Sequence, residues 1–306
     1  MNSVGVPLDK PLVRVVVAGQ RGSAPRESGA VMLVNAEGQS GTIGGGALEY
    51  KALEVARAML GKPFARELLD MPLGPALGQC CGGSVKVLVE SFANGLPDFD
   101  GIYARPVASG AVPEIPPLRV QKTLREMRSG VAARGIVLVD GWLVEPLAQD
   151  KTPLWIYGAG HVGRALVSVL SELPFTITWV DTDRARFPET LPEQVDMLVA
   201  GDPARVVKHA PEEAVHLVLT YSHALDFDIC HAVLSRGFGA LGVIGSDTKR
   251  ARFVKRLRQA GVDPSRMQCP IGDRSLGKEP MAIAVGVAAA LLQQRATQEQ
   301  KREVRA

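Results

Sequence analysis

Two adjacent cysteines, Cys80 and Cys81, stand between glycines in the segment LGQCCGG of residues 77–83. Consecutive Cα atoms lie about 3.8 Å apart, closer than the roughly 4.4–6.8 Å of a relaxed disulfide, so we expect no bond between the two. The pair also lacks the ligand spacing of a structural zinc site. Flanking glycines would let a ligand approach two soft sulfur atoms closely. The alternative is a pair of buried cysteines that pack as small apolar side chains.

Two other loops in the first half of the chain could hold an anion. Arg26 ends the turn-rich segment GQRGSAPR, and its guanidinium suits a phosphate or carboxylate, although a solvated surface arginine is the plainer reading. Gly44, Gly45 and Gly46 precede a helix expected over residues 47–60. Backbone N–H groups at such a helix start favour anions, whereas a tight turn or a close backbone crossing would explain the glycines equally well.

A glycine fingerprint opens the second half of the chain. Gly158, Gly160 and Gly163 stand between an expected strand at 153–157 and an expected helix, and the next expected strand ends at Asp181. This is the context of a dinucleotide-binding loop, in which the glycines receive the pyrophosphate and the acid accepts from a ribose hydroxyl. His161, after the second glycine, would line the nucleotide pocket or cap the helix.

Further strands expected at 196–200, 215–221 and 240–244 alternate with helices, which predicts a doubly wound parallel sheet. Functional loops of such a sheet lie at the carboxyl ends of its strands. His223 and Lys249 would lie at that edge. His223 could act as a ligand or base, or Ser222-His223 could simply begin a helix, and Lys249 is the residue of a basic helix that is best placed to meet an anion.

Composition limits the classes of function. The 306 residues carry a net charge of +3 and only 5% aromatic residues, which gives no argument for nucleic-acid binding. No basic and apolar leader is present at the N-terminus and no apolar run is long enough to cross a bilayer, so no membrane association is expected. Four cysteines do not form a disulfide framework, and the cytoplasm is the expected compartment.

The sequence therefore predicts an α/β protein of two domains. An N-terminal α+β domain over residues 1–95 would precede a proline-rich linker and hairpin over 96–150. A Rossmann-like domain with a doubly wound parallel sheet would occupy 151–295, and a polar tail would follow over 296–306.

Motifs along nearly the whole chain resemble the XdhC family of xanthine dehydrogenase accessory proteins. The segments that carry the resemblance are GSAPRESGAVMLV, GTIGGGALE, LGQCCGG, IYGAGHVGRAL, FTITWVDTD, SHALD, VIGSDTKRARF, CPIG and KEPMAIAVGVAA, in that order. The resemblance implies a molybdenum cofactor chaperone without turnover of its own. Such a protein binds the molybdopterin cofactor, supports exchange of an oxo for a sulfido ligand on molybdenum with a cysteine desulfurase, and inserts the cofactor into xanthine dehydrogenase through its molybdenum subunit.

The resemblance also implies roles for single residues. Cys80 and Cys81 would face molybdenum or handle sulfur, with Gln79 beside them. Anion chemistry more than the family suggests that the pterin phosphate meets Arg26 and the run Gly44 to Gly46. Tyr221 and Asp247 depart from the family pattern, which often has histidine and arginine there, so paired histidines and an anion-binding arginine at that edge are in doubt.

A homodimer is the expected assembly, and NAD(P) or another nucleotide is a further candidate ligand of the glycine fingerprint. Two other functions stay open on the sequence. One is a stand-alone NAD(P)-dependent oxidoreductase with the cysteine pair as a vicinal thiol active site. The other is a scaffold with a vestigial Rossmann domain and buried structural cysteines.

Overall fold

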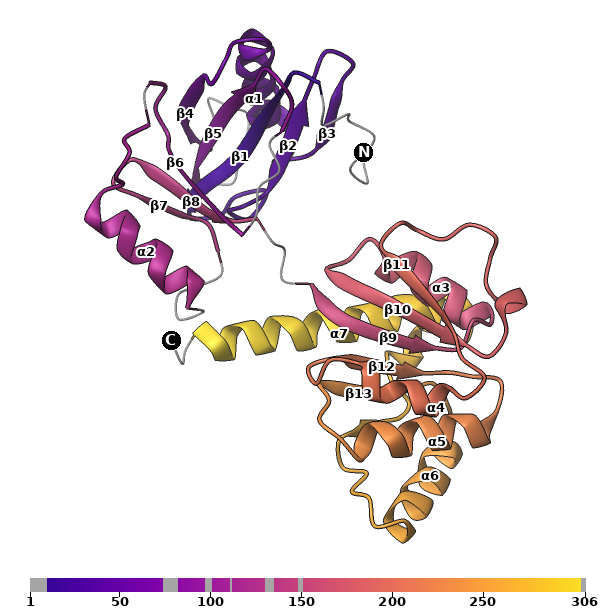
Figure 1. Cartoon of the computed structure of the whole chain (residues 1–306). Helices are drawn as coiled ribbons and strands as arrows, with labels where there is room; N and C mark the ends of the chain where they lie inside the picture. The colour runs from indigo at the N-terminus through magenta and orange to yellow at the C-terminus, as the bar shows by residue number, and fades with distance from the viewer. Residues whose placement is uncertain are drawn as a thin grey trace. The chain divides into compact units, whose positions relative to one another are not determined.

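The computed structural model describes residues 10–73, 82–96, 101–110, 112–129, 135–147 and 151–303. The chain divides into two compact units, Met1–Ala148 and Gln149–Arg305 (Figure 1). Among the residues described, no helix combines the length and apolar character needed to cross a membrane. The first unit is built on antiparallel sheets and the second on a parallel sheet, which confirms the predicted fold class.

An antiparallel sheet of five strands, in the order β3-β2-β1-β5-β4, forms the centre of the first unit. Its strands are β1 (Leu12–Arg21), β2 (Val31–Val34), β3 (Gln39–Gly41), β4 (Arg66–Pro72) and β5 (Ser84–Phe92). β1 extends to Arg21, because its pairing with β5 resumes after a bulge between Val17 and Gly19. Helix α1 (Gly46–Met59) buries Leu48 and Ala52 against one face of this sheet.

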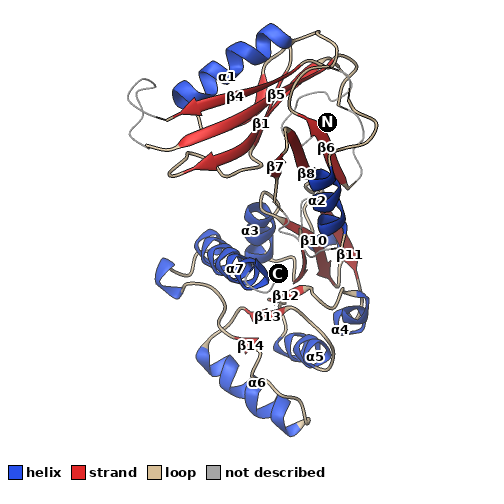
Figure 2. Cartoon of the chain, turned by 90° about the vertical axis from the view of Figure 1, so that its left-hand side faces the viewer, coloured by secondary structure: helices blue, strands red, loops and turns tan. Residues whose placement is uncertain are grey.

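A second sheet covers the other face. It holds β6 (Ile102–Pro106), β7 (Val137–Val139) and β8 (Trp142–Pro146) in the order β6-β8-β7, flanked by helix α2 (Leu118–Arg128) (Figure 2). Alternation along β1 explains the two layers, because Val15 packs toward α1 while Val16 packs with Leu143 of β8. The hairpin expected around Asp140-Gly141 is present, with φ of 48° and 74° at its turn.

Strand β6 lies inside the segment expected to be a linker. Its prolines hid the strand in the sequence, and long-range pairing with β8 holds it in place. Arg105 of β6, 1% exposed, donates from Nη2 to Oε2 of Glu90 at 2.7 Å and forms an ion pair with Glu145 at 2.8 Å. Arg14 of β1 pairs with Glu90 and Glu145 as well, and Arg66 of β4 lies 3.3 Å from Glu90. This buried charge network joins the two sheets.

The second unit is a parallel sheet in the order β11-β10-β9-β12-β13-β14, the order of a dinucleotide-binding sheet. Its strands are β9 (Thr152–Tyr157), β10 (Phe175–Asp181), β11 (Val195–Val199), β12 (Val215–Val218), β13 (Ala240–Val243) and β14 (Met267–Gln268). Its helices are α3 (His161–Leu170), α4 (Pro203–Val206), α5 (His223–Leu234), α6 (Asp247–Gln259) and α7 (Pro280–Glu303).

Helices cover both faces of this sheet. Residues of α3 and α7 fill the core on one face, whereas residues of α5 and α6 fill it on the other, together with Val207 and Ala210 that follow α4 (Figure 1). α7 continues through the first residues of the expected polar tail, to Glu303. Because the strand order reverses between β9 and β12, their carboxyl ends form the edge where ligands of such sheets bind.

Candidate functional site

Three glycine-rich loops of the first unit lie against one another. Ser23 forms a parallel bridge with Gly82, and a side chain at Gly83 would collide with the backbone oxygen of Ser23. Gly44, with a φ of 123°, leaves equally little room beside the ring of Pro25. Larger residues would separate these backbones, so the glycines serve close approach of the chain to itself.

The glycine run before α1 already holds a carboxylate of its own chain. Oε2 of Glu49, in the first turn of α1, accepts hydrogen bonds from the N–H groups of Ile43 and Gly45, each at 3.1 Å. Burial opposes its charge, but these bonds and one from Thr42 outweigh burial and hold the pKa of Glu49 below its ordinary value. The N–H of Gly44 donates to Thr42 Oγ1 at 3.1 Å. A phosphate at this loop would have to displace Glu49.

Arg26 forms an exposed ion pair with its neighbour. Its Nη2 lies 3.1 Å from Oε1 of Glu27, and this hydrogen bond raises the pKa of Arg26. Contact between Arg26 and an anion stays a prediction. Gln79, Cys80 and Cys81 lie outside the residues that the structure describes.

The fingerprint glycines of the second unit each have a different surrounding. Gly158 has a φ of 122°, and a Cβ there would lie 2.5 Å from the carbonyl oxygen of Leu219. A Cβ at Gly163 would collide with the carbonyl oxygen of Gly158. Gly160 has open space around its Cβ position, which is the room that a pyrophosphate needs. The loop therefore leaves room for a pyrophosphate at Gly160, and nucleotide binding stays a prediction.

Asp181, expected to accept from a ribose hydroxyl, is only 3% exposed. Its Oδ2 accepts from the N–H of Ala159 at 2.6 Å, and its Oδ1 accepts from the N–H of Thr182 at 2.6 Å. Nε of Arg186 lies 3.6 Å from Oδ1. The carboxylate thus holds the fingerprint loop to the end of β10, a contact that the spacing alone did not indicate.

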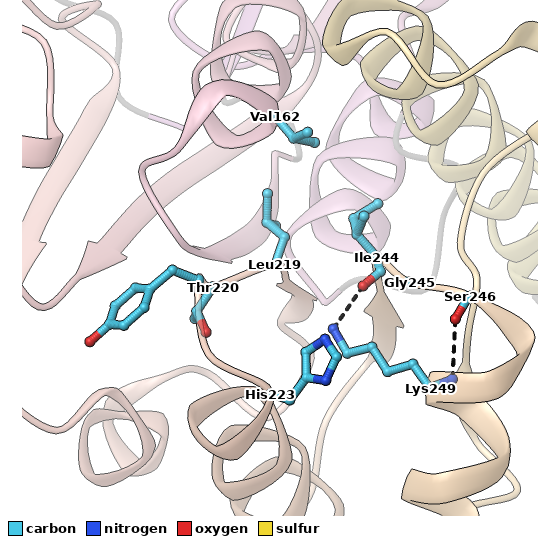
Figure 3. Close-up of a pocket in the computed structure, with 9 residues that line it drawn as sticks. Val162, Leu219, Thr220, His223, Ile244, Gly245, Ser246 and Lys249 are labelled. Carbon is cyan, nitrogen blue, oxygen red and sulfur yellow. Dashed lines mark hydrogen bonds between the residues drawn. The ribbon is translucent and has the colours of Figure 1, made fainter.

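A cavity of about 270 Å³ opens at the carboxyl ends of β12 and β13 (Figure 3). Its walls combine apolar and polar side chains from the loops after β9, β12 and β13: Val162, Leu219, Thr220, Tyr221, His223, Ile244, Gly245, Ser246 and Lys249. Its place matches the topological switch point of the sheet, where ligands of open α/β folds bind.

Lys249 lines this cavity from a buried position. It is 8% exposed, and its Nζ donates to Oδ2 of Asp226 at 2.5 Å and to the carbonyl oxygen of Ile244 at 2.9 Å. Oδ1 of Asp226 accepts from the N–H and the hydroxyl of Thr220, at 2.8 and 2.7 Å. Asp226 therefore neutralises Lys249 in this structure, and contact between Lys249 and an anion stays a prediction.

The two rim histidines have different surroundings. His161 is the exposed first residue of α3, after the N-cap Gly160. His223 is the first residue of α5, where Ser222 caps the helix by accepting from the N–H of Leu225, so the helix-entry reading is confirmed. His223 also lines the cavity. Within the described ranges no three His, Cys, Asp or Glu side chains gather in a way that could hold a metal ion.

Sequence reasoning missed two interactions at this edge. Arg186 was not singled out, yet its guanidinium lies 4.1 Å above the ring of Tyr221, one of the departures from the family pattern. Asp247, the other departure, pairs with Arg274 at 2.6 Å, and this hydrogen bond lowers the pKa of Asp247. Their partners are distant in sequence, so no local pattern could have found them.

Comparison with known protein families follows the two units. Residues 154–291 match the family model described as the XdhC Rossmann domain, and residues 8–69 match the model described as the XdhC and CoxI family. The chain belongs to the XdhC family. As an XdhC-family protein it has both matched regions in the order expected from its motifs.

Two curated relatives of this XdhC-family chain are distant and longer. It is 26% identical over 296 residues to the "Uncharacterized protein YqeB" of Escherichia coli, covering 92% of the chain and 43% of that protein. It is 26% identical over 150 residues to a Bacillus subtilis protein described as a probable subunit of xanthine dehydrogenase, covering 48% of the chain and 44% of that protein. The chain thus spans less than half the length of either relative.

A solved structure shares the fold of the XdhC-family chain. It is described as a xanthine dehydrogenase from Bacillus halodurans, with a TM-score of 0.74 at 20% identity, covering 94% of this chain and 93% of the other. At this identity the likeness supports the architecture alone.

Proposed function

We propose that this XdhC-family chain is an accessory protein of xanthine dehydrogenase that carries a molybdopterin-type molybdenum cofactor as its cargo. The convergence of glycine-rich loops carries the proposal. Ser23 pairs with Gly82, the residue that directly follows Cys80 and Cys81 in the sequence, and Gly44 closes on Pro25 beside it. Glycines at these contacts leave no side chains in the way of a ligand, and the two cysteines precede Gly82 directly in the sequence.

In this proposal the cysteines supply the chemistry. Thiolates are soft ligands that can meet molybdenum or sulfide, and a cationic neighbour such as Arg26 would favour the thiolate form. Gln79 would contact the cargo beside them. A cysteine desulfurase would supply the sulfur, and the molybdenum subunit of xanthine dehydrogenase would receive the sulfurated cofactor. A homodimer working in the cytoplasm completes the proposal.

The pterin phosphate contact is the weaker part of the proposal. Glu49 binds the N–H groups of Ile43 and Gly45. Arg26 is therefore the better phosphate partner in this unit, while the run Gly44 to Gly46 would serve mainly to keep the loops in contact.

Cofactor retention tests the function. The purified full chain is incubated with molybdenum cofactor, and bound cofactor is separated by gel filtration. We expect the Cys80→Ala/Cys81→Ala variant to lose the bound cofactor, while Cys230→Ala, a buried cysteine of the second unit, keeps it. If the wild type and both variants retain the same amount of cofactor, Cys80 and Cys81 do not bind it. Apo xanthine dehydrogenase that gains the same activity with and without the chain would contradict the carrier function.

A second function is favoured by the open space at Gly160 and the cavity at β12 and β13. We propose that the second unit binds a dinucleotide there, with Gly158, Gly160, His161 and Gly163 around the pyrophosphate. Such binding could regulate the carrier, or it could serve an NAD(P)-dependent oxidoreductase that uses the cysteine pair. Steady NADH or NADPH oxidation with a small substrate and no partner protein would favour the oxidoreductase, and its absence would leave binding alone.

A further inference from the structure

Asp181, the carboxylate expected to accept from a ribose hydroxyl, is buried and already hydrogen-bonded to its own chain. Asp181 is 3% exposed, its two oxygens accept from Ala159 and Thr182, and Arg186 lies against it at 3.6 Å. The guanidinium of Arg186 also lies over the ring of Tyr221, 4.1 Å from its centroid. A ribose that approached this point would therefore meet the edge of Arg186 before it met Asp181.

Three arginines belong to the segments at this end of β10. Arg164 of α3 donates from Nη2 to the carbonyl oxygen of Arg186 at 2.6 Å. Arg184 belongs to the same short 3-10 turn as Arg186, and its Nη1 donates to the carbonyl oxygen of Pro188 at 3.4 Å. Within the described part of the chain, the terminal nitrogens of Arg186 have no hydrogen-bond partner of their own. Against these three positive charges stand two negative ones, Asp181 and Asp183.

The negative charges are both engaged. Asp183 accepts from the N–H of Ala185 at 2.9 Å and so caps the turn that carries the arginines. Asp181 holds the fingerprint loop. The exposed Arg164 and Arg184 and the half-buried Arg186 therefore outnumber the two carboxylates at this end of the fingerprint. A guanidinium fork is the donor best matched to a phosphate monoester.

We propose that the second unit selects a dinucleotide whose adenosine ribose carries a 2′-phosphate, with Arg186 as the specificity-determining residue and Arg164 and Arg184 in support. The proposal rests on the dinucleotide binding proposed above. It reverses what the acid at the end of β10 indicates by itself, since an exposed acid there would accept from a free 2′-hydroxyl and repel the phosphate. Tyr221 keeps the Arg186 guanidinium in place by stacking.

Titration calorimetry at fixed ionic strength tests the proposal by measuring the affinity of the full chain for NADPH and for NADH. We expect NADPH to bind about 10-fold or more tightly than NADH, as a charge-assisted bidentate contact allows. 2′-AMP should compete for the site better than 5′-AMP. Arg186→Ala should abolish the preference by weakening NADPH alone, Arg186→Lys should keep part of it, and Arg258→Ala, an exposed arginine of α6, should change nothing.

Thermal unfolding of each variant separates loss of binding from loss of the fold. Equal affinities for NADH and NADPH, tighter NADH binding, or an unchanged preference in a folded Arg186→Ala variant would each overturn the selectivity. If neither dinucleotide binds, the dinucleotide role fails together with it. The cofactor-carrier function is judged separately, by the Cys80→Ala/Cys81→Ala variant.

Discussion

Both units of this XdhC-family protein bury ionic groups, and they use them differently. In the first unit Arg14, Glu90, Arg105 and Glu145 join two sheets, with all four side chains at most 6% exposed. In the second unit Lys249 lines a cavity at the edge of the sheet and pairs with the buried Asp226. Buried charge serves packing in one unit and shapes a candidate site in the other.

The glycine loops of the two units are also partly occupied by their own chain. Glu49 binds the N–H groups of Ile43 and Gly45 in the run before α1, and Asp181 binds the N–H of Ala159 in the fingerprint loop. An anion at either helix start would therefore bind only to the backbone donors that these carboxylates leave free.

The largest effect should come from the buried charge network. Glu90→Gln leaves Arg14, Arg66 and Arg105 with one buried carboxylate fewer, and we expect the first unit to lose about 3–5 kcal/mol of its free energy of unfolding. Hydrogen exchange followed by mass spectrometry should show lost protection in β5 and β8 but not in β12. Glu54→Gln, at an exposed position of α1, is the control, and equal effects of the two would contradict the network's role.

Breaking the Lys249–Asp226 pair should lower the free energy of unfolding of the second unit by somewhat less than Glu90→Gln lowers that of the first. Lys249→Met leaves the carboxylate of Asp226 buried beside Thr220 alone, at a cost of about 3 kcal/mol. The double variant Lys249→Met/Asp226→Asn removes the uncompensated charge and should recover part of the loss. The stability of each variant is measured by urea unfolding in a Trp142→Phe background, with the fluorescence of Trp155 and Trp179 as the signal. A double variant no more stable than the single one would refute this explanation.

Acid should weaken the second unit first. Burial, with Arg236 nearby, lowers the pKa of His216 to about 4, and its Nδ1 faces the hydroxyl of Tyr157 at 3.1 Å. Between the folded pKa of about 4 and the ordinary pKa of about 6.5, His216 is protonated in the unfolded chain but not in the folded one. The free energy of unfolding should therefore fall by up to about 1.4 kcal/mol per pH unit between about pH 6.5 and 4. His216→Gln should flatten this slope in urea titrations at several pH values.

A smaller acid effect is expected in the first unit. Hydrogen bonds outweigh partial burial and lower the pKa of Glu49, so its contribution is complete above the unfolded pKa of about 4.3 and is lost as the pH falls through the folded value. Glu49→Gln should cost about 1 kcal/mol at neutral pH and less at acid pH. An undiminished cost at acid pH, measured by urea unfolding, would mean that the charge of Glu49 is not what binds the glycine loop.

The smallest effect on stability should come from Gly160→Ala. Because the Cβ enters open space at a φ of −76°, the free energy of unfolding should change by less than about 0.5 kcal/mol, while dinucleotide binding falls. Gly163→Ala is the matched contrast: its Cβ meets the oxygen of Gly158, and overpacking should cost about 1–3 kcal/mol. Undiminished nucleotide binding by a stable Gly160→Ala variant would place the nucleotide elsewhere.

Local patterns predicted most elements of both units. The valine-rich run of β1, the alternating residues of β5, the Asp140-Gly141 hairpin and the glycine fingerprint before α3 each carry their signal within a few residues. Strand β6 was not predicted because it is held by pairing with β8, which lies far along the chain. Pro146 of β8 pairs with Ile102, and Trp142 pairs with Pro106.

What the sequence determined by itself is the set of backbone conformations and the family: alternating apolar residues specify strands, and glycine permits the turns that only it can adopt. What only the tertiary structure decided is the state of the charged groups. Lys249 is neutralised by Asp226, and Glu49 accepts a hydrogen bond from the N–H of Gly45 in the glycine loop before α1. Asp181 is buried beside Arg186, whose guanidinium lies over the ring of Tyr221. Electrostatic partners are chosen by distance in space, and folding brings together residues whose separation along the chain carries no such signal.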